Sequence, residues 1–441
     1  MKHTSIISRG RSVVVLAGML LAILTADLSF AQNSNDGSVY TRFGLGQRQT
    51  WLSAKGQAMG GGGLALSSSL YANPQNPASL SDQILTRFAG GLTYESITTE
   101  ADGFDPGTLA SGMLSGVHLT IPLRINKLGL GFSMSPYTRV SYRIQDLGAV
   151  APDPSSQETS ALIKEFNGNG GLYQLSSGVG YRLSPRLSAG ASLNFIFGIL
   201  EEARSTFFND ARFVDRTVRE STRLRGASAT LGARFIVPGL PEGMGLVVAS
   251  TFTLPTTLDG ERSSALTTSV GRDTLGTTTN GDVSLPMGFS AGIAFQPERR
   301  WTVLADVTWE EWSSLESDFS LPGVPLTGTN TLSDRLRVSS GLEFWPGSGR
   351  PFASYRSMIA YRVGAYTDRA YASPLANETI RSVGITGGLS IPSLIPGTTI
   401  DLNIDVGQRG QTGNGLVKDR YLRFGLNINF GERWFDRLPL G

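Results

Sequence analysis

The stretch that decides the fold is Leu285–Trp312, with the sequence LPMGFSAGIAFQPERRWTVLADVTWEEW. From Trp301 to Trp309 every second side chain is apolar, and most of the side chains between them are polar. This repeat of two residues predicts a β-strand with one apolar and one polar face. The turn Gln296–Arg299 joins it to a second strand-like segment. Because tryptophan favours membrane–water boundaries, Trp301 and Trp309 are expected as interface anchors of a lipid-facing hairpin in a transmembrane β-barrel.

The same alternation recurs from Thr86 to the end of the chain, and it is clearest in Leu422–Phe430. It predicts fourteen strands, at approximately 86–100, 111–125, 128–146, 170–183, 186–204, 219–237, 243–260, 280–296, 300–318, 330–346, 352–367, 380–392, 398–411 and 419–431. Short turns alternate with longer polar loops, expected at Leu147–Asn169, Ser205–Val218, Arg262–Asn280 and Phe319–Asn330. The predicted fold class is therefore all-β, a 14-stranded antiparallel transmembrane β-barrel whose two ends lie on the periplasmic, short-turn side.

The N-terminus has the pattern of a secretory signal peptide. Lys2, Arg9 and Arg11 precede an apolar run, Val13–Leu24, and small residues stand before Gln32. The alternative is a membrane anchor, but the run is shorter than the roughly 20 residues that span a bilayer. We expect residues 1–31 to be removed and the mature chain to reach the outer membrane of a Gram-negative-type cell.

Composition excludes several classes of site. The chain has no cysteine, which rules out disulfides and thiolate metal sites. His118 is the one histidine after residue 31, so multi-histidine metal sites and most catalytic triads have too few residues. The mature chain is formally neutral, and nothing in it suggests a nucleic-acid surface. We expect no enzyme activity, no catalytic residue, no metal and no cofactor.

Residues 32–82 lack the two-residue repeat and are expected to form a compact hatch that plugs the lumen. Glycine allows tight bends, and each Asn-Pro pair favours a turn. The residues expected to shape the hatch are Gly60, Gly61, Asn73, Pro74, Asn76, Pro77 and Ala78. The alternative is a flexible glycine-rich linker. Residues 83–432 are then the barrel, and residues 433–441 a short periplasmic tail.

Charged residues occupy the polar faces of the predicted strands. We expect nine of them to face the lumen, where charges of both signs can pair: Arg182, Arg234, Asp306, Glu310, Arg356, Arg362, Asp401, Asp405 and Arg423. The competing all-β fold is a soluble sandwich, but its strands are usually shorter and its inner face apolar. Acid–base chemistry at Asp306 and Glu310 lacks a positioned nucleophile, so pairing in the lumen is favoured.

Three segments together resemble the FadL family of outer-membrane transporters for long-chain fatty acids and aromatic hydrocarbons. They are Met59–Gly61 with Asn76–Ala78, the Leu285–Trp312 stretch, and RSMIAYRVGAY at Arg356–Tyr366. The resemblance covers nearly the whole mature chain and implies passive transport of hydrophobic molecules, such as fatty acids, through the lumen and a lateral opening in the wall. The outer-membrane lipids would be the other partner.

The opening is expected near Pro136, because proline lacks the backbone donor that a wall strand uses, and because the resembled family kinks its third strand. The alternative at Pro136 is a tolerated bulge. The YTRFGLG and GGGG segments depart from the best-known members and resemble a divergent branch that includes the outer-membrane shuttle protein of the type IX secretion system. An alternative function is therefore that of an interaction protein that receives secreted cargo, with secretion-machinery proteins as partners.

Overall fold

The computed structural model describes residues 37–50, 53–66, 71–150, 159–268, 271–324, 332–350, 354–375, 378–395 and 397–434. The expected signal peptide lies outside the described residues, as do residues 435–441 of the expected tail. Among the helices of the described residues, none has both the length and the apolar character needed to cross a membrane.

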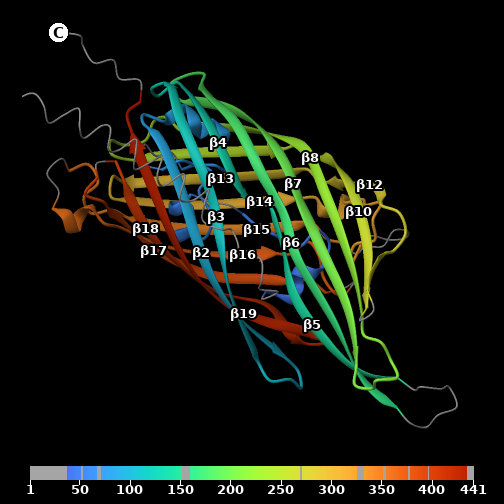
Figure 1. The fold of residues 1–441 in the computed structure, drawn as a ribbon. Helices are drawn as coiled ribbons and strands as arrows, with labels where there is room; N and C mark the ends of the chain where they lie inside the picture. Colours follow the sequence, from blue (N-terminus) through green and yellow to red (C-terminus); the bar gives the residue numbers. More distant parts are fainter. Residues whose placement is uncertain are drawn as a thin grey trace, which may run out of the picture. The chain divides into compact units, whose positions relative to one another are not determined.

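The wall consists of antiparallel strands in chain order (Figure 1). They are β2 (Thr86–Ala101), β3 (Gly107–Arg124), β4 (Leu128–Pro136), β5 (Thr138–Val150), β6 (Ser160–Arg182), β7 (Leu187–Phe208), β8 (Arg216–Ile236), β9 (Gly245–Thr253), β10 (Thr256–Thr268), β11 (Arg272–Thr274), β12 (Thr279–Leu285), β13 (Gly288–Glu298), β14 (Trp301–Glu310), β15 (Arg335–Phe344), β16 (Ala360–Arg369), β17 (Arg381–Pro392), β18 (Thr399–Gly413) and β19 (Leu416–Glu432). The last strand pairs with the first, with Phe430 opposite Phe88, so the sheet closes into a barrel.

Three wall strands are interrupted, and each break lies at or beside a proline. Pro136 is the last residue of β4, Pro255 separates β9 from β10, and Pro286 separates β12 from β13. A proline cannot donate to the ladder, which explains the break in pairing. When each interrupted pair is taken as one strand and the short loop strand β11 is set aside, the described residues form fourteen wall strands. The predicted fold class is confirmed.

The outer face of the wall is apolar and the inner face polar. In β19, Phe424 and Ile428 are 47% and 44% exposed, whereas Asn427 between them is 5% exposed and faces inward. In β14, Val303 and Val307 lie on the exposed face. This is the alternation of a barrel with lipid outside and polar groups inside.

The wall is much taller on one side than on the other. β6, β7 and β8 have 23, 22 and 21 residues, whereas β15 and β16 have 10 each. Figure 1 shows β5–β8 continuing as long hairpins beyond the neighbouring strands. The loop expected at Leu147–Asn169 is consequently wrong for most of its length, because β5–β6 pairing extends to Val150 opposite Ser160. The loop expected at Ser205–Val218 is wrong for half of its length, because β7 reaches Phe208 and β8 begins at Arg216. Polar residues toward the ends of these hairpins look like loop in the sequence, although the ladder continues through them.

The other two expected loops also differ in part. β10 reaches Thr268, so the connection expected to begin at Arg262 starts later. In the connection after β14, described up to residue 324, the 3-10 helix η4 (Trp312–Ser314) and residues 315–324 fold inward. Their side chains Trp312, Leu315, Phe319, Leu321 and Val324 are buried in a cluster with residues of β5–β8, β10 and β12. This cluster covers the lumen on the long-loop side.

The N-terminal residues 37–82, here called the inner segment, contain η2 (Val39–Arg42), β1 (Gln47–Arg48), α2 (Ala54–Ala58) and η3 (Pro77–Asp82). Glycines on the inner face of the wall allow its backbone to approach closely: Pro77 lies against Gly180 and Gly190, and Met59 lies against Gly341 and Gly364. These two contacts involve opposite sides of the ring of strands, β6–β7 and β15–β16. The inner segment therefore lies within the barrel (Figure 1).

Candidate functional site

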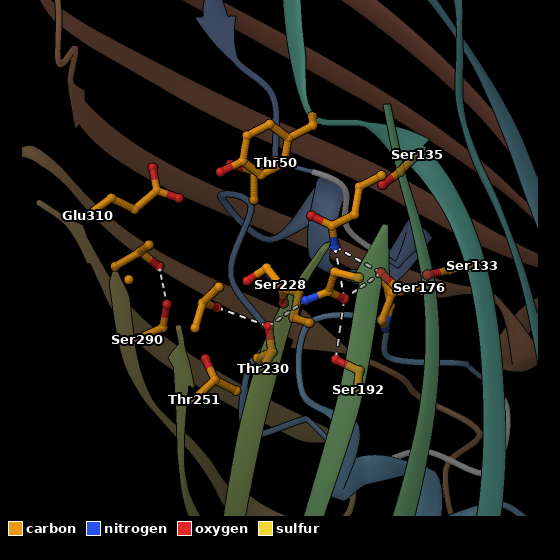
Figure 2. Close-up of a pocket in the computed structure, with 18 of the residues that line it drawn as sticks. Thr50, Ser133, Ser135, Ser176, Ser192, Ser228, Thr230, Thr251, Ser290 and Glu310 are labelled. Carbon is orange, nitrogen blue, oxygen red and sulfur yellow. Dashed lines mark hydrogen bonds between the residues drawn. The ribbon is translucent and has the colours of Figure 1, made fainter. Parts of the chain in front are cut away.

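A cavity of about 200 Å³ lies between the inner segment and the wall. Its most distinctive lining is a set of hydroxyl and amide side chains on β4, β6–β9, β13 and β14, shown in part in Figure 2. These side chains are Ser133, Ser135, Gln174, Ser176, Ser192, Asn194, Ser228, Thr230, Thr251, Thr253, Ser290 and Thr308. We call it the hydroxyl cavity.

Asn194 of β7 is the centre of a hydrogen-bond network that crosses four strands in the cavity wall. Its Oδ1 accepts from the Ser176 hydroxyl at 2.7 Å, and its Nδ2 donates to Thr230 Oγ1 at 2.9 Å. The Thr230 and Thr253 hydroxyls are 3.0 Å apart and continue the network to β9 (Figure 2). The side chains hold one another in place and present a rigid polar surface to the cavity.

Other lining hydroxyls are open. Within the described residues, no hydrogen bond is recorded for the side chains of Ser133, Ser135 or Thr251, all of which line the cavity. A hydroxyl can donate one hydrogen bond and accept two, so these groups are available to water or to a ligand.

The structure places several residues singled out from the sequence around this cavity: Gly61, Asn73, Pro74, Pro77, Pro136, Asp306 and Glu310. Asn73 folds the inner segment, since its Nδ2 donates to the carbonyls of Gly63 at 2.8 Å and Leu66 at 3.1 Å. Asn76 ties the inner segment to the wall by donating to the Ala233 carbonyl of β8 at 3.2 Å. Its Oδ1 also accepts from the Ala78 amide at 3.0 Å, which caps the start of η3.

Gly60 is fixed from the wall side. Its amide donates to the Thr386 hydroxyl of β17 at 2.7 Å, and its carbonyl accepts from the Arg337 guanidinium at 3.0 Å. Its φ of +72° lies in the left-handed region, where glycine is favoured.

A second cavity, of about 170 Å³, lies on the side of β15–β19. Its lining is rich in charged groups, including Arg335, Asp368, Asp405, Arg409 and Arg423. We call it the charged cavity. Arg48, Gln49 and Thr50 of the inner segment line both cavities, so they form a partition between them.

Ion pairs hold the partition in place. Arg48 Nε lies 3.2 Å from Glu310 of β14, and Glu310 also lies 3.1 Å from Arg335 of β15. Arg335 continues to Asp368 of β16 at 2.7 Å. Charges of alternating sign are thus neutralised within the lumen, as a buried charge requires.

A second charge network anchors α2. Lys55 lies 2.5 Å from Glu343 of β15, and Arg362 of β16 bridges Glu343 at 2.8 Å to Asp401 of β18 at 2.9 Å. The Tyr71 hydroxyl accepts from Arg362 at 2.9 Å. Burial lowers the pKa of Lys55, partly offset by Glu343, and burial raises the pKa of the Tyr71 phenol to about 12.

The remaining charges expected in the lumen also lie on inner faces, with one exception. Arg182 and Arg234 both form ion pairs with Asp82 at the end of η3. Arg423 pairs with Glu95 and lies 3.0 Å from Asp405. Arg356 was expected in a strand, which is wrong: it is exposed on the 3-10 helix η5 (Tyr355–Met358), because β16 begins only at Ala360.

The two tryptophans expected at the interface lie at opposite ends of β14. The Trp301 ring packs on Phe344 of β15 with centroids 4.4 Å apart. The Trp309 indole donates to Asp334 at 3.2 Å. Trp312, three residues further on, is buried and stacks on Tyr371 at 4.0 Å instead of facing outward.

The wall changes its pairing at Pro136. The last pair between β3 and β4 is Val117 with Met134, and among the described residues 107–116 of β3 pair with β2 alone. β5 remains paired with β6 but has no strand of the wall on its other edge. Backbone glycines at positive φ, Gly116 in β3 and Gly170 in β6, mark the places where the strands bend apart.

The inner segment occupies the free edge of β5. The Tyr137 carbonyl accepts from the Gln49 amide at 2.9 Å, and Gln47 pairs with Arg139. The Thr41 hydroxyl donates to the Ser141 carbonyl at 2.8 Å and accepts from its amide at 3.0 Å. The polar backbone groups at this interruption are therefore satisfied from inside the barrel.

Sequence reasoning missed the hydroxyl lining. The inward positions of the strand at Leu187–Phe197 were identified as polar from Ser188, Gly190, Ser192 and Asn194, but only charged residues were selected as lumen candidates. Where β4 and β6–β9 line this cavity, their polar side chains are uncharged.

Comparison with known proteins identifies the fold. The chain is similar to the CymD monoaromatic hydrocarbon channel (TM-score 0.55, 16% identity), covering 89% of this chain and 100% of that chain. It is also similar to a Pseudomonas aeruginosa FadL homologue (TM-score 0.54, 12% identity, 88% and 99% covered) and to the Ralstonia pickettii toluene transporter TbuX (TM-score 0.52, 14% identity, 90% and 100% covered). The expected FadL-type fold is confirmed. No curated protein sequence matches the chain significantly.

Because the sequence identities to these solved structures are low, the structures establish the fold alone. The family of the chain follows from a match to its sequence. The description named BamG matches residues 13–439, nearly the whole sequence, and the chain therefore belongs to the BamG family.

Proposed function

We propose that this protein is a passive outer-membrane channel for hydrophobic compounds, such as long-chain fatty acids, with the inner segment as its hatch and an exit through the wall beside Pro136. The observation that carries the proposal is the change of pairing there. β4 pairs with β3, whereas β5 takes residues of the inner segment as its partner instead. A solute that reaches the lumen can then pass sideways into the lipid without crossing a continuous ladder of wall hydrogen bonds.

The inner segment supports the proposal as the part that must move. It lines both cavities and occupies the free edge of β5. Its edge contact with β5 is short, since β1 has two residues. A strand pair of this length contributes little stability by itself, so it can separate without unfolding the wall.

Three solved structures with this fold support the substrate class, because they are a monoaromatic hydrocarbon channel, a toluene transporter and a FadL homologue. The apolar outer face of the wall supports a location in the outer membrane.

The test is uptake of a labelled long-chain fatty acid and of labelled toluene by cells that lack the gene or carry a variant. Met113 lines the charged cavity, on the stretch of β3 that pairs with β2 alone. We expect Met113→Trp to reduce uptake several-fold by obstructing the exit, and Pro136→Val to reduce it by restoring a donor. The matched control is Leu193→Trp, on the outer face of β7.

Unchanged uptake in both exit variants, with normal amounts of protein in the outer membrane, would rule out the lateral exit. If loss of the gene leaves uptake unchanged and the protein co-purifies with secreted proteins, the chain is instead a cargo-receiving interaction protein of the secretion type.

A further inference from the structure

The hydroxyl cavity has a chemical character that a hydrocarbon path does not require. The side chains that β4, β6, β7, β8 and β9 contribute to its polar lining are serine, threonine, asparagine and glutamine. A cavity suited to hydrocarbon is lined mainly by apolar side chains. Covering the open hydroxyls of Ser133, Ser135 and Thr251 with hydrocarbon would remove their water without replacing its hydrogen bonds, which is unfavourable.

The cavity is equally unsuited to an ionic head group. Its charged lining residues lie on the inner segment, β14 and β15, and each already has a partner: Arg48, Asp306, Glu310, Arg335 and Arg337. Arg337 pairs with Asp368, which lies outside this cavity. Arg48 and Arg335 both pair with Glu310, and Asp306 accepts from the amides of Gly63 and Leu64. A carboxylate or sulfate entering the cavity would have to break one of these pairs to find a cation.

The size of the space agrees with a compact polar group. The cavity, of about 200 Å³, has room for several water molecules. A single sugar ring or a small polyol fills a space of this order. Its hydroxyls both donate and accept, and so match the mixed lining of hydroxyl and amide groups.

The cavity also adjoins the wall interruption, because Pro136 and Tyr137 are among its lining residues. We propose that the hydroxyl cavity binds the uncharged, hydroxyl-rich head group of an amphiphile, whose apolar chain lies toward the interruption between β3 and β5. This inference rests on the proposed function, since it uses the same lateral exit, and it identifies the substrate class as neutral glycolipid-like or polyol-headed amphiphiles.

The test is binding to the purified protein in lipid nanodiscs, free of glycoside detergents. The probes share one alkyl chain: hexyl β-glucoside, hexyl sulfate and hexanoate, each below its micelle concentration and measured by saturation-transfer NMR and titration calorimetry. We expect hexyl β-glucoside to bind at least tenfold more tightly than either ionic probe.

Two variants locate the site. Asn194→Leu removes the centre of the hydrogen-bond network, and Ser133→Ala with Ser135→Ala removes two open hydroxyls while leaving the network intact. We expect each to weaken hexyl β-glucoside binding about tenfold. Because Asn194→Leu can disturb folding, the double serine variant decides the outcome. The control is Thr98→Val, which removes a hydroxyl that does not line the cavity.

Equal binding of the glucoside and the ionic probes, or unchanged glucoside binding in the double serine variant, would overturn the inference. The results that would refute the proposed channel differ from those that would refute the head-group site. If Met113→Trp leaves uptake unchanged while the glucoside still binds at Ser133 and Ser135, the cavity is a head-group site in a protein without the lateral exit. If uptake depends on Met113 but the glucoside has no preference, the channel stands and the head-group site is rejected.

Discussion

Asp306 of β14 accepts a hydrogen bond from the backbone amide of Leu64 at 2.9 Å and a second from the amide of Gly63. One carboxylate on the wall thus satisfies two consecutive donors in the glycine-rich part of the inner segment. Gly62, beside them, also packs on Leu304 and Ser339. The strand that is most recognisable in the sequence therefore supplies the point at which the inner segment is fastened to the wall.

Replacing this carboxylate should loosen the inner segment. Asp306→Ala leaves two buried amides without an acceptor, at a cost of about 1–3 kcal/mol each. We expect a clear increase in small-ion conductance in planar bilayers and faster hydrogen exchange at Gly63 and Leu64. The control is Asp306→Asn, which keeps an acceptor oxygen and should have a smaller effect. Conductance equal to that of the unchanged protein in Asp306→Ala would show that other contacts are sufficient.

The charge network that anchors α2 predicts which of two substitutions, Arg362→Met or Lys55→Met, lowers the free energy of unfolding more. Arg362→Met leaves the carboxylates of Glu343 and Asp401 buried with one cation fewer, and breaking a buried pair costs about 3–5 kcal/mol. Lys55→Met leaves Glu343 with Arg362 and should cost less. Urea unfolding of protein folded into lipid vesicles measures both free energies of unfolding. The reverse order, with Lys55→Met the more destabilising, would contradict the central position of Arg362.

Because the inner segment lies close to the wall at Gly364 but not at Gly112, alanine substitutions at these two glycines should affect stability differently. A Cβ on Gly364 of β16 would overlap the Gly60 amide and Met59, whereas a Cβ on Gly112 of β3 would meet nothing within 4 Å. Gly364→Ala should therefore cost about 1–3 kcal/mol through overpacking. Gly112→Ala should be neutral or stabilise by about 0.4–1 kcal/mol. Thermal unfolding followed by the gel mobility of the folded barrel compares the two, and equal stabilities would place Met59 and Gly60 elsewhere.

On the outward face of β14, a charged substitution should destabilise the folded barrel by an amount that depends on its depth in the bilayer. Val307 is 37% exposed and pairs across the strands with Val338, which is also exposed. If Val307 lies near the bilayer midplane, Val307→Arg should destabilise the folded barrel by roughly 2–4 kcal/mol. Phe104→Arg, in the turn between β2 and β3, serves as the control and should cost little. Folding titrations in vesicles test the pair, and a cost-free Val307→Arg would place this face in water.

The sequence predicted the wall well because the signal is local. In an antiparallel barrel each strand alternates between lipid and lumen, so the two-residue repeat in segments such as Leu422–Phe430 is sufficient to identify the strand and its faces. The repeat was less reliable at strand ends. β6 begins at Ser160, ten residues before its expected start, since the two-residue repeat is weak in residues 160–169.

The candidate site was predictable only in part. The prolines and asparagines of Asn73–Ala78 indicate turns wherever they occur, and Pro136 indicates a break in a ladder, because both effects depend on the backbone of one or two residues. The hydroxyl cavity was not predictable, because its lining comes from strands more than 150 residues apart, such as those of Ser133 and Ser290. No local pattern relates these positions.

The sequence by itself therefore determined the barrel, the number of its strands and which side chains face inward, since these follow from the period of the repeat and the places where it stops. Only the tertiary structure decided what the inward side chains do. The pairing of the free edge of β5 with Gln47 and Arg48, the fastening of Gly63 and Leu64 by Asp306, and the separation of the hydroxyl cavity from the charged cavity all arise when the ring closes around the inner segment. Closure of the barrel brings residues that are far apart in the sequence within hydrogen-bond distance. Their spacing along the chain does not reveal which of them will become neighbours.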